Sequence, residues 1–472
     1  MSDLDPNRDS SGNLNHAGNN RLSSSQRIAI LTVAFLGWFF GGVQIGITGV
    51  AMRDAPIELM NRTGELDLAE YQRLNSLNND RAELTDAESS QLREWNSAAG
   101  SWFGWYQCAF LFGAAAGGFV FGRLGDRLGR TKTLALSIFC FSALTGVSYF
   151  VTSPTQLLVL RFLACLGIGG AWPNGVALVS EAWSNAARPV VSSAIGMAGN
   201  LGIFAMFTAA KFYEVTPDQW RWVMIVGGAP VVLGIITWFA IPESPAWLKL
   251  AREQSQGTTT SPVPAVTGEK GFAATVFIGI ALATIPLAGG WGSANWMLPW
   301  AGEVGAPSLK ADIGMARSIT SIVGSLIAGW IACRFGRRMT YAVTSVCALL
   351  VAQYAFWFTT PTQDGFLIWV GLLGLFNGLY FGWLPFFLPE MFEARVRSAG
   401  AGISFNSGRI LTAITIFATT AMKDAFNNDY AMIGRVTSWV FILGAFAVAF
   451  APDTSKVDMS TDSEPEEPQE SS

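Results

Sequence analysis

Histidine is almost absent from this sequence, and this absence excludes several kinds of chemistry. The single histidine, His16, lies in a polar N-terminal stretch. A histidine metal site or a histidine proton relay is therefore excluded from the apolar part of the chain. No phosphate loop of the G-x-x-x-x-G-K-[ST] type occurs, which argues against an ATP-driven pump. We expect no metal, no other cofactor and no enzymatic activity.

Charge is also scarce. Charged residues make up 14% of the chain and hydrophobic residues 51%. Apolar runs of about 20 residues predict transmembrane helices, so the domain count that the length alone would suggest does not apply. No basic patch favours nucleic acid as a partner. The five cysteines lie in or beside apolar runs, so no disulfide framework is predicted.

Twelve apolar runs predict an all-α membrane protein with twelve transmembrane helices. An even number places both termini on one side, and the short loops on that side are richer in Lys and Arg, which predicts cytoplasmic termini. We expect a monomer in the plasma (inner) membrane, with the lipid bilayer and a small-molecule substrate as its partners. The runs are 28–52, 98–121, 133–151, 155–180, 190–212, 221–241, 273–300, 313–332, 340–359, 365–388, 398–422 and 432–451.

The polar segments divide the chain into two halves of six spans each. The N-terminal half covers 27–241, including a charged outer loop at 53–97, in which Thr85-Asp-Ala-Glu88 predicts a helix N-cap. Segment 242–272 is a predicted cytoplasmic linker, and the C-terminal half covers 273–452. Residues 1–26, which lack the pattern of a signal peptide, and residues 453–472 are predicted disordered tails.

A charged, glycine-punctuated stretch lies between the second and third runs. It contains Gly122, Leu124, Asp126, Arg127, Gly129 and Arg130. These residues resemble the loop signature of the major facilitator superfamily, roughly G-x-L-x-D-R-x-G-R-[RK]. The resemblance implies a transporter made of two pseudo-symmetric six-helix bundles, with the substrate near the midplane between them.

The second half repeats motifs of the first at nearly the same spacing. Gly122-x4-Arg127-x-Gly129-Arg130 recurs as Gly329-x4-Arg334-x-Gly336-Arg337, with Cys333 in place of Asp126. Glu181-x6-Arg188 recurs as Glu390-x6-Arg397, and Pro242-Glu243-Ser244 recurs as Pro452-Asp453-Thr454. Such internal repetition is typical of secondary transporters.

The sequence resembles two branches of the superfamily. Pro242-Glu-Ser-Pro-Ala-Trp-Leu248 is similar to the sugar-porter signature after the sixth helix, with Ala246 where that signature has Arg. The seventh helix departs from sugar porters, because Asn295 is present but glycines replace the paired glutamines at 289 and 290. In contrast, Ser404-Phe-Asn-Ser-Gly-Arg409 and Glu181-Ala-Trp183 resemble bacterial metabolite:proton symporters, which carry organic acids such as sialate or aromatic acids.

Ionisable residues within the runs point to the substrate site. We find no Asp or Glu within any run, and we expect two arginines there, Arg161 and Arg409. Arg409 lies roughly 16 Å into its run at 1.5 Å per residue. Since a buried charge without a partner is costly, its natural partner is a carboxylate on the substrate, whereas Arg161 matches a position common to the family. The candidate substrate-binding residues are Arg409, Asn406, Asn377, Gln44, Gln107, Asn295 and Asn200.

A second set of residues is expected to form the cytoplasmic gate. These residues stand in the repeated motifs, and we expect them to form ion pairs when the gate is closed. Exposed pairs are worth only ~0–1 kcal/mol, which suits a gate that must open. The gate candidates are Asp126, Arg127, Arg130, Glu181, Arg188, Glu243, Arg334, Arg337, Glu390, Arg397 and Asp453.

The sequence thus predicts a secondary active transporter of a small organic anion that works by alternating access. A sugar transporter of the same fold is the main alternative, and a non-transporting nutrient sensor remains open. The first run, at Gly41-Gly-Val-Gln44, lacks the acid that related symporters often carry. Proton symport, uniport, exchange and cotransport of a proton on the substrate carboxyl therefore all remain open.

Overall fold

The computed structural model describes residues 22–79, 83–182, 188–255, 271–304, 309–392, 397–421, 423–426, 429–452 and 454. Throughout these ranges the chain forms helices joined by turns, with no strand. Eleven helices or helix pairs are long and apolar enough to cross a membrane. The remaining predicted run, 398–422, corresponds to α16, which has 25 residues. The all-α prediction with twelve spans is therefore confirmed.

The N-terminal half contains six membrane-crossing segments. The last of them is divided by a turn between two shorter helices. The segments are α1 (Ser24–Ala51), α4 (Asp86–Leu128), α5 (Arg130–Val147), α6 (Pro154–Ala182), α7 (Arg188–Phe212), and α8 (Trp222–Gly228) with α9 (Val231–Ala240).

The C-terminal half follows the same plan. Its first segment is broken by a short 3-10 turn, and its last is divided like that of the N-terminal half. The segments are α11 (Phe272–Gly292) with η3 (Ala294–Trp296) and α12 (Met297–Glu303), α13 (Leu309–Phe335), α14 (Arg337–Phe358), α15 (Phe366–Glu390), α16 (Arg397–Ala421), and α17 (Tyr430–Thr437) with α18 (Val440–Ala447).

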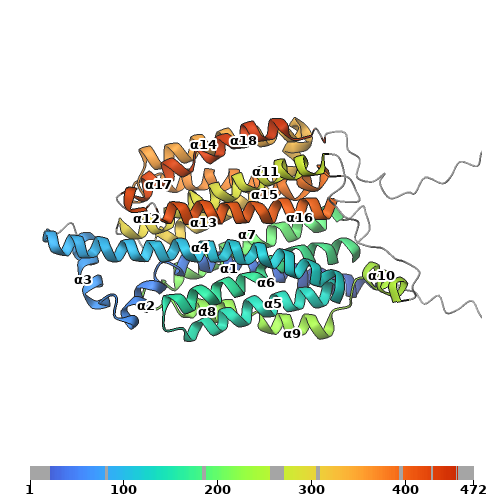
Figure 1. Cartoon of the computed structure of the whole chain (residues 1–472), viewed down its shortest axis with the longest axis horizontal. Helices are drawn as coiled ribbons and strands as arrows, with labels where there is room; N and C mark the ends of the chain where they lie inside the picture. The colour runs from blue at the N-terminus through green and yellow to red at the C-terminus, as the bar shows by residue number, and fades with distance from the viewer. Residues whose placement is uncertain are drawn as a thin grey trace, which may run out of the picture.

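The two halves lie side by side (Figure 1). They meet mainly where α4 packs on α16 and where α7 packs on α13. The helix α10 (Pro245–Ser255) lies at the end of the molecule at which α1 begins, which we call the terminal end. The helices α2 (Ala55–Thr63) and α3 (Leu68–Asn79) lie at the opposite end, which we call the cap end.

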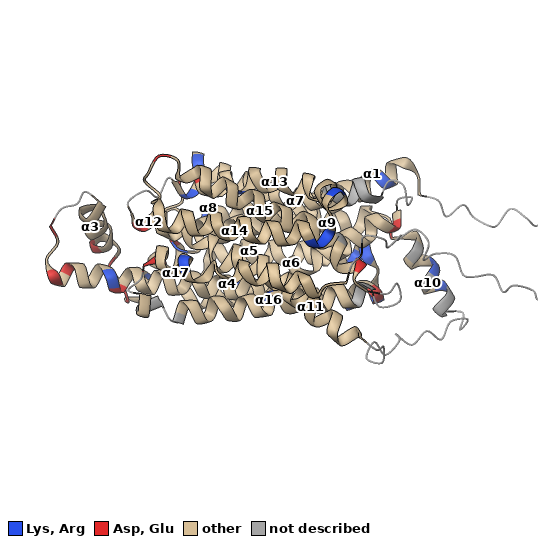
Figure 2. Ribbon diagram, turned by 90° about the horizontal axis from the view of Figure 1, so that it is seen from above, with Lys and Arg blue, Asp and Glu red and all other residues tan. Residues whose placement is uncertain are grey.

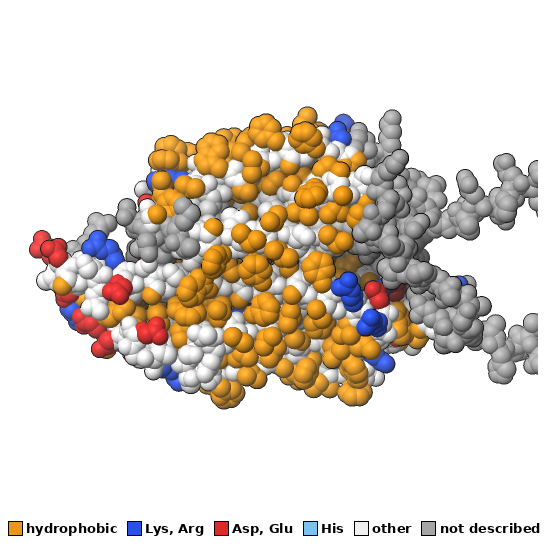
Figure 3. All heavy atoms as spheres, in the orientation of Figure 1, with side chains coloured by type: hydrophobic (Ala, Val, Ile, Leu, Met, Phe, Trp, Pro, Cys, Tyr) orange, Lys and Arg blue, Asp and Glu red, His pale blue; other side chains and the backbone are white. Residues whose placement is uncertain are grey.

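The surface is divided into an apolar middle and two charged ends. Figure 2 shows the Lys, Arg, Asp and Glu residues gathered at the two ends of the bundle. Figure 3 shows hydrophobic side chains covering the face between them. Large aromatic side chains in this zone are unusually exposed; Phe239 is 82% exposed and Phe277 is 73% exposed. Such exposure is unfavourable in water but expected for side chains that face lipid.

Close helix packing explains the glycines of α4 and α6. A Cβ atom added at Gly117 would lie 1.9 Å from the carbonyl oxygen of Leu166, and one at Gly169 would lie 2.1 Å from that of Ala114. Only glycine permits this approach of the two backbones. The long α4 thereby holds α6 firmly within the N-terminal half.

The repeated charged loops have the same backbone geometry in both halves. Gly129 precedes α5 with φ +102°, and Gly336 precedes α14 with φ +91°. L-residues rarely adopt this region, so glycine permits both reversals. At Gly129 a side chain is excluded for a second reason, because an added Cβ would lie 2.1 Å from Oε2 of Glu243.

The long polar segment of the N-terminal half is mostly helical. It contains α2 and α3, and α4 begins at Asp86, well before the start that the apolar run predicts. The predicted cap is confirmed. Oγ1 of Thr85 accepts from the backbone N–H of Glu88, and the carboxylate of Glu88 accepts from the backbone N–H of Thr85. The segment expected as a linker contains α10, and the N-terminal tail is shorter than predicted since α1 begins at Ser24.

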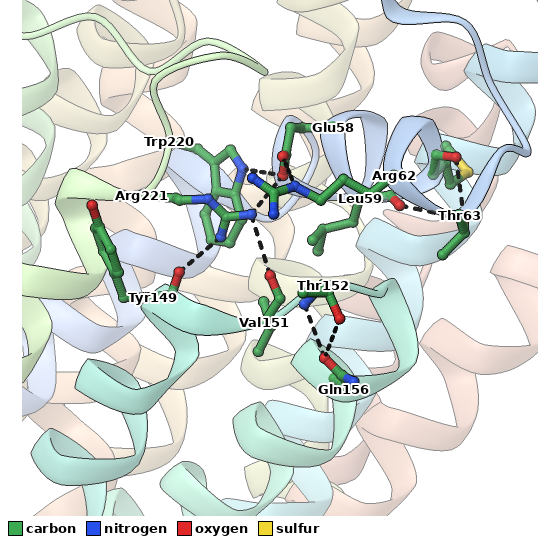
Figure 4. Close-up of polar contacts among 11 residues, drawn as sticks. Glu58, Leu59, Arg62, Thr63, Tyr149, Val151, Thr152, Gln156, Trp220 and Arg221 are labelled. Carbon is green, nitrogen blue, oxygen red and sulfur yellow. Dashed lines mark hydrogen bonds and ion pairs between the residues drawn. The ribbon is translucent and has the colours of Figure 1, made fainter.

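One charged side chain fastens α2 to the rest of the N-terminal half (Figure 4). Arg221 donates to Glu58 of α2 at 2.8 Å and to the carbonyl oxygen of Tyr149 at 2.9 Å. Its guanidinium also lies 4.5 Å from the centre of the Trp220 ring. Since these partners come from α2, the α5–α6 connection and the segment before α8, Arg221 holds three parts of the cap end together.

Candidate functional site

A polar chain crosses between the two halves at the break between α11 and α12. Arg317 of α13 donates through Nη1 to Oδ1 of Asn295 at 2.9 Å and to the carbonyl oxygen of Ala294 at 3.3 Å. Asn295 in turn donates through Nδ2 to Oε1 of Gln107 on α4 at 3.0 Å. The broken helix thus presents one amide to both halves, as expected for a substrate site in a discontinuous helix.

A small cavity, with space for about one water molecule, lies beside these hydrogen-bonded residues within the C-terminal half. Its lining includes Arg317 of α13, Asn377 of α15 and the glycine pair at the end of α11. Oδ1 of Asn377 is buried and has no hydrogen-bond partner among the described residues. The lining residues are Gly289, Gly290, Ala294, Arg317, Leu373, Asn377 and Phe441.

Arg317 is a residue that the sequence analysis missed. The prediction that Arg161 and Arg409 are the two arginines within the spans is wrong. α13 begins at Leu309, so Arg317 lies about 12 Å along the helix at 1.5 Å per residue. The signal was present in the sequence, because Arg317 stands four residues inside the predicted run 313–332.

Arg409 lies at the interface of α16 with α4. Its Nη1 donates to the carbonyl oxygen of Ala114 at 3.3 Å and to Oδ1 of Asn406 at 3.2 Å. The guanidinium also lies 4.8 Å from the centre of the Phe405 ring. All of these partners are neutral. The structure therefore brings Arg409 and Asn406 together, as their spacing of one helical turn predicts.

Gln44 and Arg161 form a buried network inside the N-terminal half. Arg161 donates to Oε1 of Gln44 at 3.2 Å and to Oγ1 of Thr48 at 2.7 Å. Gln44 also accepts from Thr145 at 2.9 Å and donates to the carbonyl oxygen of Gly227 at 2.9 Å. Because the Gln44 amide is engaged on both sides, it ties α1 to α5, α6 and α8. Its candidate role in binding substrate would require it to exchange these bonds.

Asn200 is the remaining candidate for substrate binding. Its Oδ1 accepts from Oγ of Ser321 at 3.4 Å, across the contact between α7 and α13. The pair lies between the halves, like the pair of Asn295 and Gln107. Candidates from both halves are thus brought to the interface, whereas Gln44 is not.

At the cap end the halves are joined by ion pairs. Lys310 lies 2.9 Å from Asp54, and Glu303 lies 3.5 Å from Arg53. A third pair joins Lys211 of α7 to Asp312 of α13 at 2.7 Å. Arg53, Asp54 and Lys310 are all buried. These contacts close the cap end in this conformation.

The polar segment that contains α2 and α3, which we call the insertion, supports this closure of the cap end. Oδ1 of Asn96 accepts from Arg53 at 2.9 Å and from the hydroxyl of Tyr71 at 3.0 Å. Burial raises the pKa of the Tyr71 phenol, so it stays a neutral donor. Asn96 of α4 therefore holds Arg53 near Glu303, and Tyr71 of α3 holds Asn96.

At the terminal end the motif residues form one cluster in each half. In the N-terminal half Arg130 lies 2.8 Å from Asp126 and 3.5 Å from Glu181. Glu243 accepts from the backbone N–H of Thr131 at 3.0 Å. The indole of Trp247 on α10 donates to the carbonyl oxygen of Asp126 at 2.9 Å. These bonds fasten α10 to the charged loop.

The C-terminal cluster is simpler. Arg337 lies 3.4 Å from Glu390, which also accepts from Oγ1 of Thr454 at 2.8 Å. Both clusters join residues of a single half. Among the other gate candidates, the guanidinium of Arg334 lies 5.9 Å from the centre of the Phe335 ring, and Arg127 lies in the last turn of α4. Asp453 and the side chains of Arg188 and Arg397 lie outside the described residues.

The known proteins that this chain is similar to are transporters. Residues 63–271 match a family model described as sugar (and other) transporter. The cis,cis-muconate transport protein of Acinetobacter baylyi is 28% identical over 64% of this chain and 74% of its own length. A putative niacin/nicotinamide transporter of Bacillus subtilis is 28% identical over 67% of this chain and 78% of its own length.

A solved structure has the same fold. The partially occluded, inward-open xylose transporter of E. coli superimposes with a TM-score of 0.66 at 18% sequence identity, over 91% of this chain and 100% of that one. The two six-helix halves, the repeated charged loops and these relatives lead to one conclusion. The chain belongs to the major facilitator superfamily, in the branch of sugar porters and metabolite transporters, and is a membrane transporter rather than an enzyme.

Proposed function

We propose that this protein transports a small organic anion, a carboxylate, by alternating access. The observation that carries the proposal is the environment of Arg409, whose described partners are the carbonyl oxygen of Ala114, the amide of Asn406 and the ring of Phe405. An arginine deep in a membrane protein is costly when no anion neutralises it. A substrate carboxylate would supply the missing charge through a charge-assisted bond.

The names of the relatives favour the same class of substrate. The two relatives are named for muconate and for niacin or nicotinamide, and muconate and niacin are carboxylates. The cavity residues favour it as well, because glycines stand at 289 and 290, where sugar porters carry two glutamines. A sugar is the second candidate, favoured by the presence of Asn295 and of the Pro242–Leu248 signature.

We further propose that the protein lies in the plasma (inner) membrane as a monomer, with both termini in the cytoplasm and no nucleic-acid partner. Lys and Arg are frequent in the short loops at the terminal end, and cations beside spans mark the cytoplasmic side. In this orientation the cap-end ion pairs, which join the halves, form the outer gate, and the terminal-end clusters, each within one half, lie where the cytoplasmic gate would form. Alternating access then breaks and remakes the contacts at each end in turn.

The test compares carboxylates and a sugar on variants of Arg409. Purified protein is titrated with cis,cis-muconate, niacin and xylose. Arg409→Gln is expected to weaken binding of the carboxylates by about ten- to a hundredfold, the effect of losing one charge-assisted bond. Arg409→Lys keeps the charge but not the planar fork, so it should be impaired as well.

Arg62→Gln is the matched control, because it removes an exposed arginine of α2 far from the membrane interior. It should bind all ligands like the wild type. Carboxylate binding that is unchanged in Arg409→Gln would contradict the proposed role of Arg409. A wild type that binds xylose and neither carboxylate would contradict the organic-anion function itself and favour the sugar.

A further inference from the structure

We infer that the C-terminal half contains an anion subsite of its own, in which Arg317 holds a substrate carboxylate at the break between α11 and α12. The inference rests on the proposed function, since it places the anion that the transporter carries. It also assigns the neighbouring Asn377 as the acceptor for a hydrogen-bond donor on the same substrate. Four observations support it.

The first observation is the set of hydrogen bonds that the Arg317 guanidinium makes. Arg317 donates through one nitrogen, Nη1, to two neutral acceptors, Asn295 and the carbonyl oxygen of Ala294. No carboxylate of the described residues pairs with it. A guanidinium has five N–H donors arranged to bind a carboxylate in a bidentate manner. Arg317 therefore has the capacity to bind an anion.

The second is an acceptor without a partner. Oδ1 of Asn377 is buried, has no hydrogen-bond partner among the described residues and borders the same cavity as Arg317. A buried polar atom that lacks a partner is destabilising, and a ligand, a bound water or a functional role is the usual explanation for one in a native protein. A substrate with a hydroxyl or N–H group would satisfy it.

The third is the space between them. A Cβ atom added at Gly290 would lie 3.3 Å from Oδ1 of Asn377. Any side chain at this position would approach the asparagine and reduce the cavity. At Gly289, in contrast, an added Cβ would lie 2.1 Å from the ring of Phe441, so Phe441 fills the space beside Gly289 and only Gly290 leaves room beside Asn377. The cavity lining thus includes a cation, Arg317, and an acceptor without a partner among the described residues, Asn377.

The fourth is the link to the other half. Asn295 accepts from Arg317 and donates to Gln107, and Nε2 of Gln107 is buried without a partner among the described residues. A carboxylate that binds Arg317 competes with Asn295 for the guanidinium, and Nε2 of Gln107 is a second donor for it. Substrate binding would then change a hydrogen bond between the halves, which is what alternating access requires of a substrate.

A structural role for Arg317 is the alternative, because its bond to Ala294 also fastens the helix break. The two roles differ in their measurable consequences. If Arg317 only stabilises the break, its removal lowers the melting temperature and leaves the affinity of folded protein for carboxylates unchanged. If it binds the substrate, its removal weakens carboxylates selectively and leaves a neutral ligand unaffected.

The experiment uses the full-length protein, whose 18 tryptophans provide an intrinsic signal for melting and binding. The probes are benzoate, its three hydroxybenzoate isomers, cis,cis-muconate and xylose. Arg317→Gln should weaken the carboxylates by about ten- to a hundredfold, and Arg317→Lys should recover only part of the loss. The control Arg62→Gln should match the wild type.

Asn377→Leu tests the acceptor separately from folding. Replacing a polar group that has no partner by an apolar one of similar size should leave the melting temperature of the free protein unchanged or raise it. In the wild type at least one hydroxybenzoate should bind more tightly than benzoate, and this difference should disappear in Asn377→Leu.

The outcomes separate the inference from the proposed function. If the wild type binds carboxylates and Arg317→Gln binds them equally well, the subsite is wrong and the organic-anion function stands. If the wild type binds none of the carboxylates, the proposed function fails. If Asn377→Leu retains the preference for a hydroxybenzoate, the role of Asn377 is wrong.

Discussion

Nζ of Lys310 lies 2.9 Å from Oδ2 of Asp54, and the two residues come from opposite halves of the transporter. Lys310 stands in the first turn of α13, and Asp54 follows α1. Both are buried, so each depends on the other for neutralisation. This pair and its neighbour Arg53–Glu303 join the halves at the cap end and must separate whenever that end opens.

Breaking this pair should favour conformations with an open cap end. Asp54→Asn leaves the Lys310 charge buried without a partner, which costs about 3–5 kcal/mol for a buried pair. Opening exposes Lys310 to water, so the closed conformation is the one that is destabilised. Spin labels at Arg62 and Asp364, which are exposed positions in the two halves, should report a longer distance in a cysteine-free background.

The swapped variant Asp54→Lys with Lys310→Asp should restore the shorter distance, because it recreates the pair. Glu70→Gln is the matched control, since the ion pair of Glu70 with Arg73 lies inside α3 and does not join the two halves. An unchanged distance in Asp54→Asn would show that this pair does not hold the cap end closed.

Asp126→Asn should slow transport without preventing folding or membrane insertion. Asp126 is 67% exposed, and Arg130 retains Glu181 as a second partner, so the stability cost should be only ~0–1 kcal/mol. The backbone bond from Trp247 to Asp126 does not depend on the carboxylate. Uptake into proteoliposomes at matched protein density measures the effect. A normally inserted variant that transports at the wild-type rate would refute the gate role.

Impermeant thiol reagents test the proposed orientation. In a cysteine-free background, Glu65→Cys at the cap end should react in intact cells, whereas Ser24→Cys at the start of α1 should react only after permeabilisation. Both positions are exposed in the structure, so accessibility depends on the side of the membrane. The opposite pattern would place the termini outside and reverse the roles of the two gates.

The sequence predicts the architecture well because membrane spans require long apolar runs. It also predicts the loop motifs, because these motifs need glycine and paired charges. It does not predict the contacts between halves. Asp54 and Lys310 are 256 residues apart, and no local pattern relates them. Nor does the sequence predict the cavity, because the lining residues come from α11, η3, α13, α15 and α18. Arg317 was visible in the sequence, but its neutral partners and its place at the cavity depend on the break after α11.

The packing of α4 on α6 provides a test of the fold that is independent of the substrate. Gly169→Ala introduces a Cβ at 2.1 Å from the carbonyl oxygen of Ala114, so the two backbones must move apart. Overpacking of this kind typically costs about 1–3 kcal/mol. The matched control is Gly329→Ala in α13, where an added Cβ meets nothing within 4 Å. Because alanine favours helix over glycine by up to about 1 kcal/mol, the control should melt at the same or a higher temperature while Gly169→Ala melts lower. Equal melting temperatures for the two variants would contradict the close contact of α4 and α6.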